Sequence, residues 1–302
     1  MNKEIVDIME CDTWTKIELI QEGWSKDKKY YIENKCGQRF LLRVSDRSLF
    51  EAKRKEFEVI KKFNAANITM SKAVSFGYCN NGLSVYMLLT WVDGTVLDKV
   101  LPTLTNEGQY DIGVLAGKAL KTLHTVAIDE SDIEPDRKEY KLGRLKIYEN
   151  STVRIDNDKQ IIAYVYDNIH RIGQLPPVYK HGDYHVGNLL LTDDRTIGII
   201  DFNRWGCGDK YEDFYKVQSF DVEISVPFAV GQINGYFDDN PPKDFWDTLA
   251  VYVAHSALCM INWAEKYSQS EVIKMQHRCK RTLSDYNYFS KTIPNWYSCF
   301  TK

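Results

Sequence analysis

The sequence lacks the features that would set it apart from an ordinary globular protein. No uninterrupted apolar stretch approaches the roughly 18 residues that a membrane-spanning helix needs. The first residues, 1–7, are charged where a secretory signal carries its apolar run. The 7 cysteines form an odd set without a C-x-x-C pair. We therefore expect a cytoplasmic protein whose thiols are reduced and mostly structural.

A strong net charge of either sign is also missing. The net charge of -3 and the pI near 6.1 give no global basic field of the kind that binds a nucleic-acid backbone. We expect neither nucleic acid nor a membrane as a partner, and we expect a monomer. The 302 residues, 44% of them hydrophobic, are enough for two lobes with a sizeable core.

The first 92 residues have the pattern of a sheet that carries one helix. Alternating polar and apolar residues predict an antiparallel meander, and apolar positions at helical spacing predict one amphipathic helix after it. Two further β-rich runs flank the turn Cys-Asn-Asn-Gly. The expected strands span 14–20, 29–33, 39–44, 73–78 and 84–91, and the expected helix spans 48–63.

After residue 92 the pattern changes to longer helical periods. A capping box of Asn106 and Gln109 predicts a helix with Ile112, Leu115, Ala119, Leu123 and Val126 along one face. Further helices are expected over 161–172, 246–267 and 272–289, with a hairpin over 189–201. The fold class is therefore α+β, with one lobe over 1–92 and a mainly helical lobe over 93–302.

Residues 181–188 read H-G-D-Y-H-V-G-N, and a carboxylate, Asp201, follows the apolar strand 197–200. Phosphoryl transfer needs a hydroxyl aimed in line and a metal that neutralises phosphate charge. Asp183 could orient the acceptor hydroxyl or accept its proton. The amide oxygen of Asn188 and the carboxylate of Asp201 are the hard oxygen ligands that Mg²⁺ prefers. The segment therefore predicts a magnesium-dependent kinase.

These motifs, with the continuation G-D-K-Y-E-D-F over 208–214, resemble the aminoglycoside phosphotransferase and choline kinase group of the protein-kinase-like superfamily. The resemblance implies a two-lobed kinase fold, 1–92 as the nucleotide-binding lobe and 93–302 as the lobe with the catalytic loop and the substrate site. It makes Asp183 the catalytic aspartate and Asn188 and Asp201 the magnesium ligands. His181 would brace the loop, and Asp209 and Asp213 would anchor the helix that follows.

The same resemblance implies a site for ATP or GTP in the first lobe. Arg43 matches the basic residue that holds the α and β phosphates, and a guanidinium can grip phosphate bidentately. Glu56 matches the helix glutamate that pairs with this basic residue, and Glu51 is a weaker candidate for the same role. Ser25, in a turn with one glycine, would help to cradle the phosphates, and Thr90 and Val92 would bind the base.

Other enzyme classes fit the sequence less well. His181 and His185 have the H-x3-H spacing of a zinc pair, but no third His or Cys lies at convincing spacing. The G-x-S-x-G elbow of a serine hydrolase is absent. A kinase-shaped protein without catalysis, such as some spore-coat relatives, stays open as an alternative of another class.

The acceptor is expected to be a small molecule. Only about ten residues separate Asp201 from the helical pattern near Tyr211, too few to dock a polypeptide substrate. Acidic residues after 211 favour a cationic acceptor; they are Asp221, Glu223, Asp238, Asp239, Asp244 and Glu265. An aminoglycoside-like antibiotic, and with it a role in antibiotic resistance, is the first choice; choline, homoserine or an amino sugar is the alternative.

Overall fold

A computed structural model describes residues 4–21 and 26–300. The chain divides into two compact units, described separately here. The first comprises residues 1–94 and 192–203, and the second comprises 95–191 and 204–302. The boundary at residue 92, drawn from composition and pattern, stays a prediction.

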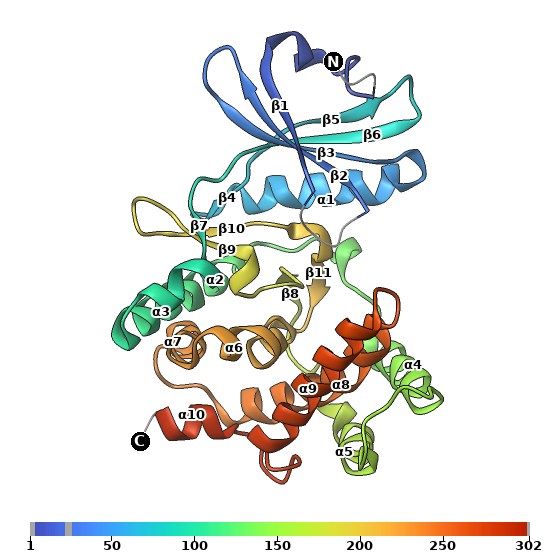
Figure 1. Ribbon diagram of the computed structural model, residues 1–302, viewed down its shortest axis with the longest axis vertical. Coiled ribbons are helices and arrows are strands. Elements are labelled where there is room, and N and C mark those ends of the chain that lie inside the picture. Colours follow the sequence, from blue (N-terminus) through green and yellow to red (C-terminus); the bar gives the residue numbers. More distant parts are fainter. Residues whose placement is uncertain (1–3, 22–25, 301–302) are drawn as a thin grey trace. The chain divides into compact units, whose positions relative to one another are not determined.

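The first unit is built on a five-stranded antiparallel sheet with strand order β1-β2-β3-β6-β5 (Figure 1). The helix α1 (Phe50–Phe63) packs against it and contacts β5 and β6. A short strand, β4 (Thr69–Met70), pairs in parallel with β10 (Ile197–Ile199). The sheet strands are β1 (Trp14–Ile20), β2 (Lys28–Asn34), β3 (Arg39–Asp46), β5 (Ala73–Cys79) and β6 (Ser84–Thr90).

The two faces of this sheet carry different cores. On one face Leu42 and Val44 of β3 belong to an apolar cluster completed by Ile5 and Ile8 from the segment before β1. Because side chains alternate along a strand, Arg43 points to the opposite face, toward α1. The sequence predicted the strands and α1, and the structure confirms the antiparallel sheet with one helix.

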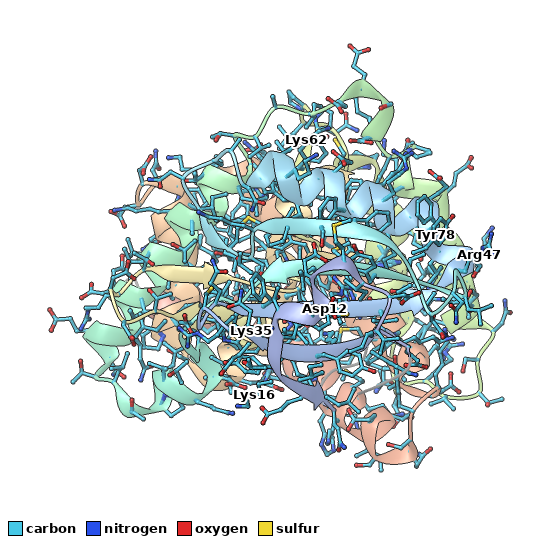
Figure 2. All side chains as sticks on the ribbon, turned by 90° about the horizontal axis from the view of Figure 1, so that it is seen from above. Asp12, Lys16, Lys35, Arg47, Lys62 and Tyr78 are labelled. Carbon is cyan, nitrogen blue, oxygen red and sulfur yellow. The ribbon has the colours of Figure 1, made fainter. Side chains whose placement is uncertain are left out.

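An aromatic group ties α1 to strand β5. Phe50 of α1 stacks on Tyr78 with ring centroids 4.4 Å apart, and Phe57 stacks on Phe76 at 5.6 Å. The guanidinium of Arg47, in the turn before α1, lies 5.5 Å from the Tyr78 ring centroid, and Figure 2 shows the two side by side. These contacts fix the helix that presents Glu56 to Arg43.

The second unit is mainly helical, as the sequence predicted. Two small antiparallel pairs of strands accompany the helices: β7 (Thr95–Val96) with β9 (Leu189–Leu191), and β8 (Val178–Lys180) with β11 (Gly206–Gly208). The helices are α2 (Leu97–Val100), α3 (Asn106–Leu123), α4 (Arg137–Glu149), α5 (Lys159–Asn168), α6 (Val222–Ile224), α7 (Val226–Phe237), α8 (Lys243–Ala264), α9 (Gln269–Asp285) and α10 (Asn295–Phe300).

Helices α3 and α7 pack through glycines. A Cβ built on Gly113, Gly117, Gly231 or Gly235 would lie under 3.0 Å from backbone atoms of the other helix, closer than real Cβ atoms come. The two backbones therefore touch along this glycine seam, which consists of these four residues. Short backbone separations of this kind are possible only where side chains are absent.

Two details of the α3 prediction are wrong. The N-cap is Thr105, whose hydroxyl accepts from the Gly108 N–H, and not Asn106. The predicted face is only partly right. Ile112 and Leu123 are buried as expected, but Leu115 is 38% exposed, and Ala116 and Leu120, which the prediction left out, are fully buried. The hydrophobic pattern missed the contact because its glycines carry no apolar side chain to count.

The apolar helix α8 is a core element. Nearly all of its residues from Phe245 to Ile261 are buried within the second unit. Across residues 4–21 and 26–300, no helix combines the length and apolar character needed to cross a membrane.

Candidate active site

The first group of predicted site residues surrounds Arg43. Its guanidinium pairs with Glu56 of α1 and, at 2.5 Å, with Asp27. Lys53 bridges the same two carboxylates, 2.7 Å from Asp27 and 3.2 Å from Glu56. The Ser45 hydroxyl donates to Asp27 at 2.8 Å. We call Arg43, Glu56, Asp27 and Lys53 the arginine cluster.

The arginine cluster holds two cations and two anions out of water. Burial raises the pKa of Asp27, but the charges of Arg43 and Lys53 outweigh it and lower the pKa to about 2. Burial lowers the pKa of Arg43, and Glu56 and Asp27 more than reverse that. Asp27 and Arg43 are therefore charged at neutral pH, and the contacts with both carboxylates fix the guanidinium in place.

The structure pairs Glu56 with Arg43, as predicted, and directs Glu51 to Arg54 on the surface. The sequence missed Asp27 and Lys53. Asp27 follows a polar turn and Lys53 lies on an amphipathic helix, and charged residues at such positions are ordinarily exposed to solvent. Ser25 lies outside the described residues.

Thr90 and Val92 follow the end of β6. The Thr90 N–H donates to the Lys72 carbonyl, and the Trp91 N–H donates to the Arg39 carbonyl, both at 2.9 Å. Within residues 4–21 and 26–300, the Val92 N–H makes no backbone hydrogen bond. Thr90, Trp91 and Val92 also line a pocket of about 410 Å³ with residues 192–194. Neither Arg43 nor Asp201 lines this pocket, so we do not equate it with the nucleotide site.

Asp201 lies in the first unit, just after β10, with its backbone in the left-handed region at a φ of 66°. A non-glycine residue held there is uncommon and is found repeatedly at functional sites. Its carboxylate lies 3.3 Å from the ammonium of Lys29 in β2. The sequence missed Lys29, whose side chain is 15% exposed and which pattern alone places on an ordinary strand.

The loop that carries Asp183 and Asn188 belongs to the second unit and is held by buried hydrogen bonds. Asp213 accepts from the N–H groups of His181 at 2.8 Å and Gly182 at 2.6 Å. The Asn188 amide donates to the Asp183 carbonyl at 2.8 Å, which closes the loop on itself. Gly182 has a φ of 77°, and a Cβ there would collide with the Arg204 carbonyl. The loop is therefore preorganised.

The supporting roles implied for His181, Asp209 and Asp213 can be located in the structure. The His181 Nδ1 accepts from the Asp183 N–H at 3.1 Å. Asp209 caps the short 3₁₀ helix Lys210–Phe214 through the Tyr211 N–H at 3.0 Å. Asp213 supports the loop, and its other partner is His124 at 3.0 Å, a contact that the sequence did not reveal.

Cationic and ring nitrogen groups gather around the carboxylate of Asp183. Lys216 pairs with its Oδ1, the Arg204 Nε lies 3.6 Å from its Oδ2, and the His185 Nε2 lies 3.7 Å from its Oδ1. Burial raises the pKa of Asp183, but Lys216 and Arg204 lower it to about 2. Burial lowers the pKa of His185 to about 4, so the imidazole is neutral at pH 7. We call Asp183, Lys216, Arg204 and His185 the aspartate cluster.

The chain matches a known enzyme family. The sequence profile of the phosphotransferase enzyme family matches residues 16–246, well over half of the chain. The chain belongs to the phosphotransferase enzyme family. This membership confirms the prediction of an enzyme that transfers a phosphoryl group to a hydroxyl.

Known relatives of this phosphotransferase include an Escherichia coli aminoglycoside 3'-phosphotransferase. The two are 25% identical over 204 residues, which is 63% of this chain and 74% of the relative. Aminoglycoside phosphotransferase APH(4)-Ia, solved as a thermostable mutant with ADP and hygromycin B, aligns with a TM-score of 0.68 at 14% identity, over 89% of this chain and 94% of that one.

A second solved structure is the GDP complex of a mutant aminoglycoside 2'-phosphotransferase-IIIa. It aligns with this phosphotransferase with a TM-score of 0.73 at 12% identity, over 94% of this chain and 96% of that one. The two structural likenesses confirm the predicted α+β protein-kinase-like fold.

The donor groups of the phosphotransferase suit Mg²⁺ better than zinc. Because the Asn188 nitrogen is used by the Asp183 carbonyl, the amide oxygen is the atom left for a cation. Asp201 adds a carboxylate, and both are the oxygen ligands that Mg²⁺ takes. Among the described residues no group of three or more His, Cys, Asp and Glu could hold a metal ion. His181 and His185 accept backbone hydrogen bonds, in keeping with bracing roles.

The acidic residues expected to attract a cationic acceptor mostly have partners in the phosphotransferase itself. Glu223 pairs with Arg278 and Arg281, and Asp238 pairs with Lys121. Asp221 is fully buried, and burial raises its pKa well above the usual range. Counting acidic residues in the sequence therefore overstated the negative charge available to a substrate.

Proposed function

We propose that this phosphotransferase transfers the γ-phosphoryl group of ATP or GTP to a hydroxyl of an aminoglycoside, with Asp183 as the catalytic residue. The observation that carries the proposal is the fixed loop in which Asp213 and Asn188 hold Asp183. The relatives named above support the choice of acceptor.

Asp183 would orient the acceptor hydroxyl and receive its proton. A carboxyl whose pKa is about 2 is a weak base toward a free alcohol. The proton therefore moves late, when the acceptor oxygen is already bonding to phosphorus and its acidity has risen. Orientation is then the main contribution of Asp183, in keeping with how little covalent help phosphoryl transfer needs.

The nucleotide would be held by residues of the first unit, in keeping with 1–92 as the nucleotide-binding lobe. Arg43, fixed by Glu56, offers its charge to the α and β phosphates, and the Val92 N–H offers a hydrogen bond to the base. Thr90 and Ser25 are proposed as further contacts. Asn188 and Asp201 would hold Mg²⁺, which when bound neutralises phosphate charge.

A nucleoside diphosphate release assay tests the proposal. Gentamicin and hygromycin B would be offered with ATP or GTP in the presence and absence of Mg²⁺, and the phosphorylated product identified by mass spectrometry. We expect release that depends on both acceptor and Mg²⁺ and that disappears in Asp183→Asn. Equal rates in the wild type and Asp183→Asn would overturn the catalytic assignment. They would favour the alternative of a kinase-shaped binding protein.

A metabolic kinase for choline, homoserine or an amino sugar is the second candidate. The engagement of Glu223 and Asp238 with their own cations favours it, since strongly cationic acceptors gain less from such a surface. The same assay with these three alcohols separates the candidates by the ratio of kcat/KM values.

The setting of the enzyme is part of the proposal. All 7 cysteines are free thiols, which suits a reducing cytoplasm. We propose that it acts there as a monomer, without nucleic acid or membrane partners. Light scattering at several protein concentrations and fractionation of expressing cells would check both points.

A further inference from the structure

Lys216 is a buried cation that the proposed function does not use. It is 6% exposed and lies between the short 3₁₀ helix Lys210–Phe214 and a π-helical turn, Val217–Asp221. Its ammonium pairs with Oδ1 of Asp183 and lies 4.9 Å from the ring centroid of Phe220. Burying an ammonium is costly unless it is paired, so the contact with Asp183 is what keeps Lys216 there.

Two other buried lysines of the second unit have a different kind of partner. Lys141 and Lys180 each bind one oxygen of Glu212, at 2.7 and 2.5 Å, so both oxygens of that carboxylate are paired with an ammonium group. Lys216 instead binds one oxygen of the carboxylate to which the catalytic role is assigned. Among the described residues, only one oxygen of Asp183 is therefore paired with a lysine, whereas both oxygens of Glu212 are.

The second oxygen of Asp183 is left comparatively free. Its Oδ2 has the Arg204 Nε at 3.6 Å, which is beyond hydrogen-bonding distance. Oδ1 takes Lys216 directly and faces His185. The closest charged contact of the carboxylate is therefore on Oδ1, which leaves Oδ2 as the oxygen available to an acceptor hydroxyl.

We propose that Lys216 is a positioning residue of phosphoryl transfer, which fixes Oδ1 of Asp183 so that Oδ2 receives the acceptor hydroxyl. This inference rests on the proposed function. In the reaction, the acceptor oxygen forms a bond to the γ-phosphorus while the bridging P–O bond breaks. The electron pair of that bond leaves with the nucleoside diphosphate, and the acceptor proton passes to Oδ2 of Asp183.

Several charged and titratable groups face this contact. The guanidinium of Arg204 faces Oδ2 of Asp183. The pKa of Asp183 is lowered to about 2 and that of His185 to about 4, so the carboxylate is charged and the imidazole neutral at pH 7, while burial raises the pKa of Asp221 well above its usual range. Arg278 reaches the ring of Phe220, with its guanidinium carbon 4.6 Å from the centroid. Removing the ammonium of Lys216 leaves Arg204 as the only full positive charge within 4 Å of the Asp183 carboxylate among the described residues.

The first test measures the contact without any acceptor. The pKa of the Asp183 carboxyl would be followed by carbon-13 NMR titration in the wild type, in Lys216→Met and in the surface control Lys280→Met. Losing an adjacent positive charge is expected to raise that pKa by about 1 to 3 in Lys216→Met. The control should not move it. An unchanged pKa in a folded Lys216→Met protein would overturn the contact on which the inference depends.

The second test measures catalysis. We expect kcat to fall about 10²-fold in Lys216→Met with little change in the KM for nucleotide, and the acidic limb of the pH profile to move upward. Lys216→Gln, which keeps an N–H donor without charge, should recover part of kcat. If Lys216 acts through Asp183, adding Lys216→Met to Asp183→Asn should cause no further loss.

The outcomes separate this inference from the proposed function. A wild type that transfers nothing to any acceptor refutes the function. A wild type that is active, with Asp183→Asn inactive and Lys216→Met unchanged, refutes only the role of Lys216. If Lys216→Met does not fold, Lys216→Gln takes its place, and wild-type kcat in a folded Lys216→Gln protein with an unshifted acidic limb refutes that role.

Discussion

The arginine cluster and the aspartate cluster differ in their balance of charge. In the first unit a guanidinium lies between two carboxylates, Asp27 and Glu56, and Lys53 completes the balance. In the second unit a carboxylate lies among Lys216, Arg204 and a neutral imidazole, so positive charge is in excess. A balanced cluster stabilises the fold and holds a fixed cation. A cluster with excess positive charge is suited to a group that brings negative charge, such as a phosphate.

Replacing the central carboxylate of the aspartate cluster should have the largest effect. Asp183→Asn keeps the size of the side chain but loses the charge and the proton acceptor. We expect phosphoryl transfer to fall about 10² to 10⁴-fold, with nucleotide affinity close to that of the wild type. Stopped assays and calorimetric titration with ADP would measure the two quantities.

The corresponding change in the arginine cluster is Arg43→Met. It leaves the buried carboxylates of Asp27 and Glu56 with Lys53 but without the guanidinium, so the free energy of unfolding should drop by about 3 to 5 kcal/mol. Nucleotide affinity should fall as well. Arg43→Lys restores the positive charge but not the two-pronged hydrogen bonding of the guanidinium. It should recover part of the free energy of unfolding and part of the nucleotide affinity. Urea denaturation and nucleotide titration of the three proteins would show whether charge or geometry dominates.

The arginine cluster should make the stability of the protein depend on pH in the acid range. The pKa of Asp27 is lowered in the folded state from 3.8 to about 2, so its contribution to stability is present above pH 3.8 and is lost as the pH falls toward 2. A change of that size corresponds to about 2 kcal/mol. Urea unfolding between pH 5 and 2, compared between the wild type and Asp27→Asn, should show a shallower decline for the variant. Parallel curves would contradict this assignment.

The smallest effect is expected for an exposed pair on the same helix. Arg54 and Glu51 lie 2.8 Å apart, but their side chains are 49% and 73% exposed. Arg54→Ala should change the free energy of unfolding by no more than about 0.5 kcal/mol, and the change should vanish in high salt. A loss of stability comparable to that of Arg43→Met would mean that burial does not explain why the Arg43–Glu56 pair contributes more than the Arg54–Glu51 pair.

Much of the first unit could be predicted from the sequence, because its strands alternate and α1 is amphipathic. Arg43 and Glu56 were found through their place in a motif, and the structure pairs them. Asp27 and Lys53 could not be found in this way. They are charged residues of a turn and a helix, and only the folding of those segments onto β3 removes them from water.

The aspartate cluster shows the same limit. Asp183 and Asn188 stand out by spacing within one loop, whereas Lys216 lies 33 residues further on and matches no motif. Its role depends on the 3₁₀ and π-helical turns that return the chain to the loop. Turns of this kind have no hydrophobic period for pattern analysis to detect.

The glycine seam between α3 and α7 has a consequence for inheritance. None of Gly113, Gly117, Gly231 and Gly235 leaves room for even one methyl group, so any missense change in those four codons forces the two helix backbones to shift. A gene under selection for a new acceptor can vary the helices around its substrate, but it must pass these codons on as glycine. The seam therefore reduces the number of substitutions that the gene can accept, although its four glycines take no part in phosphoryl transfer.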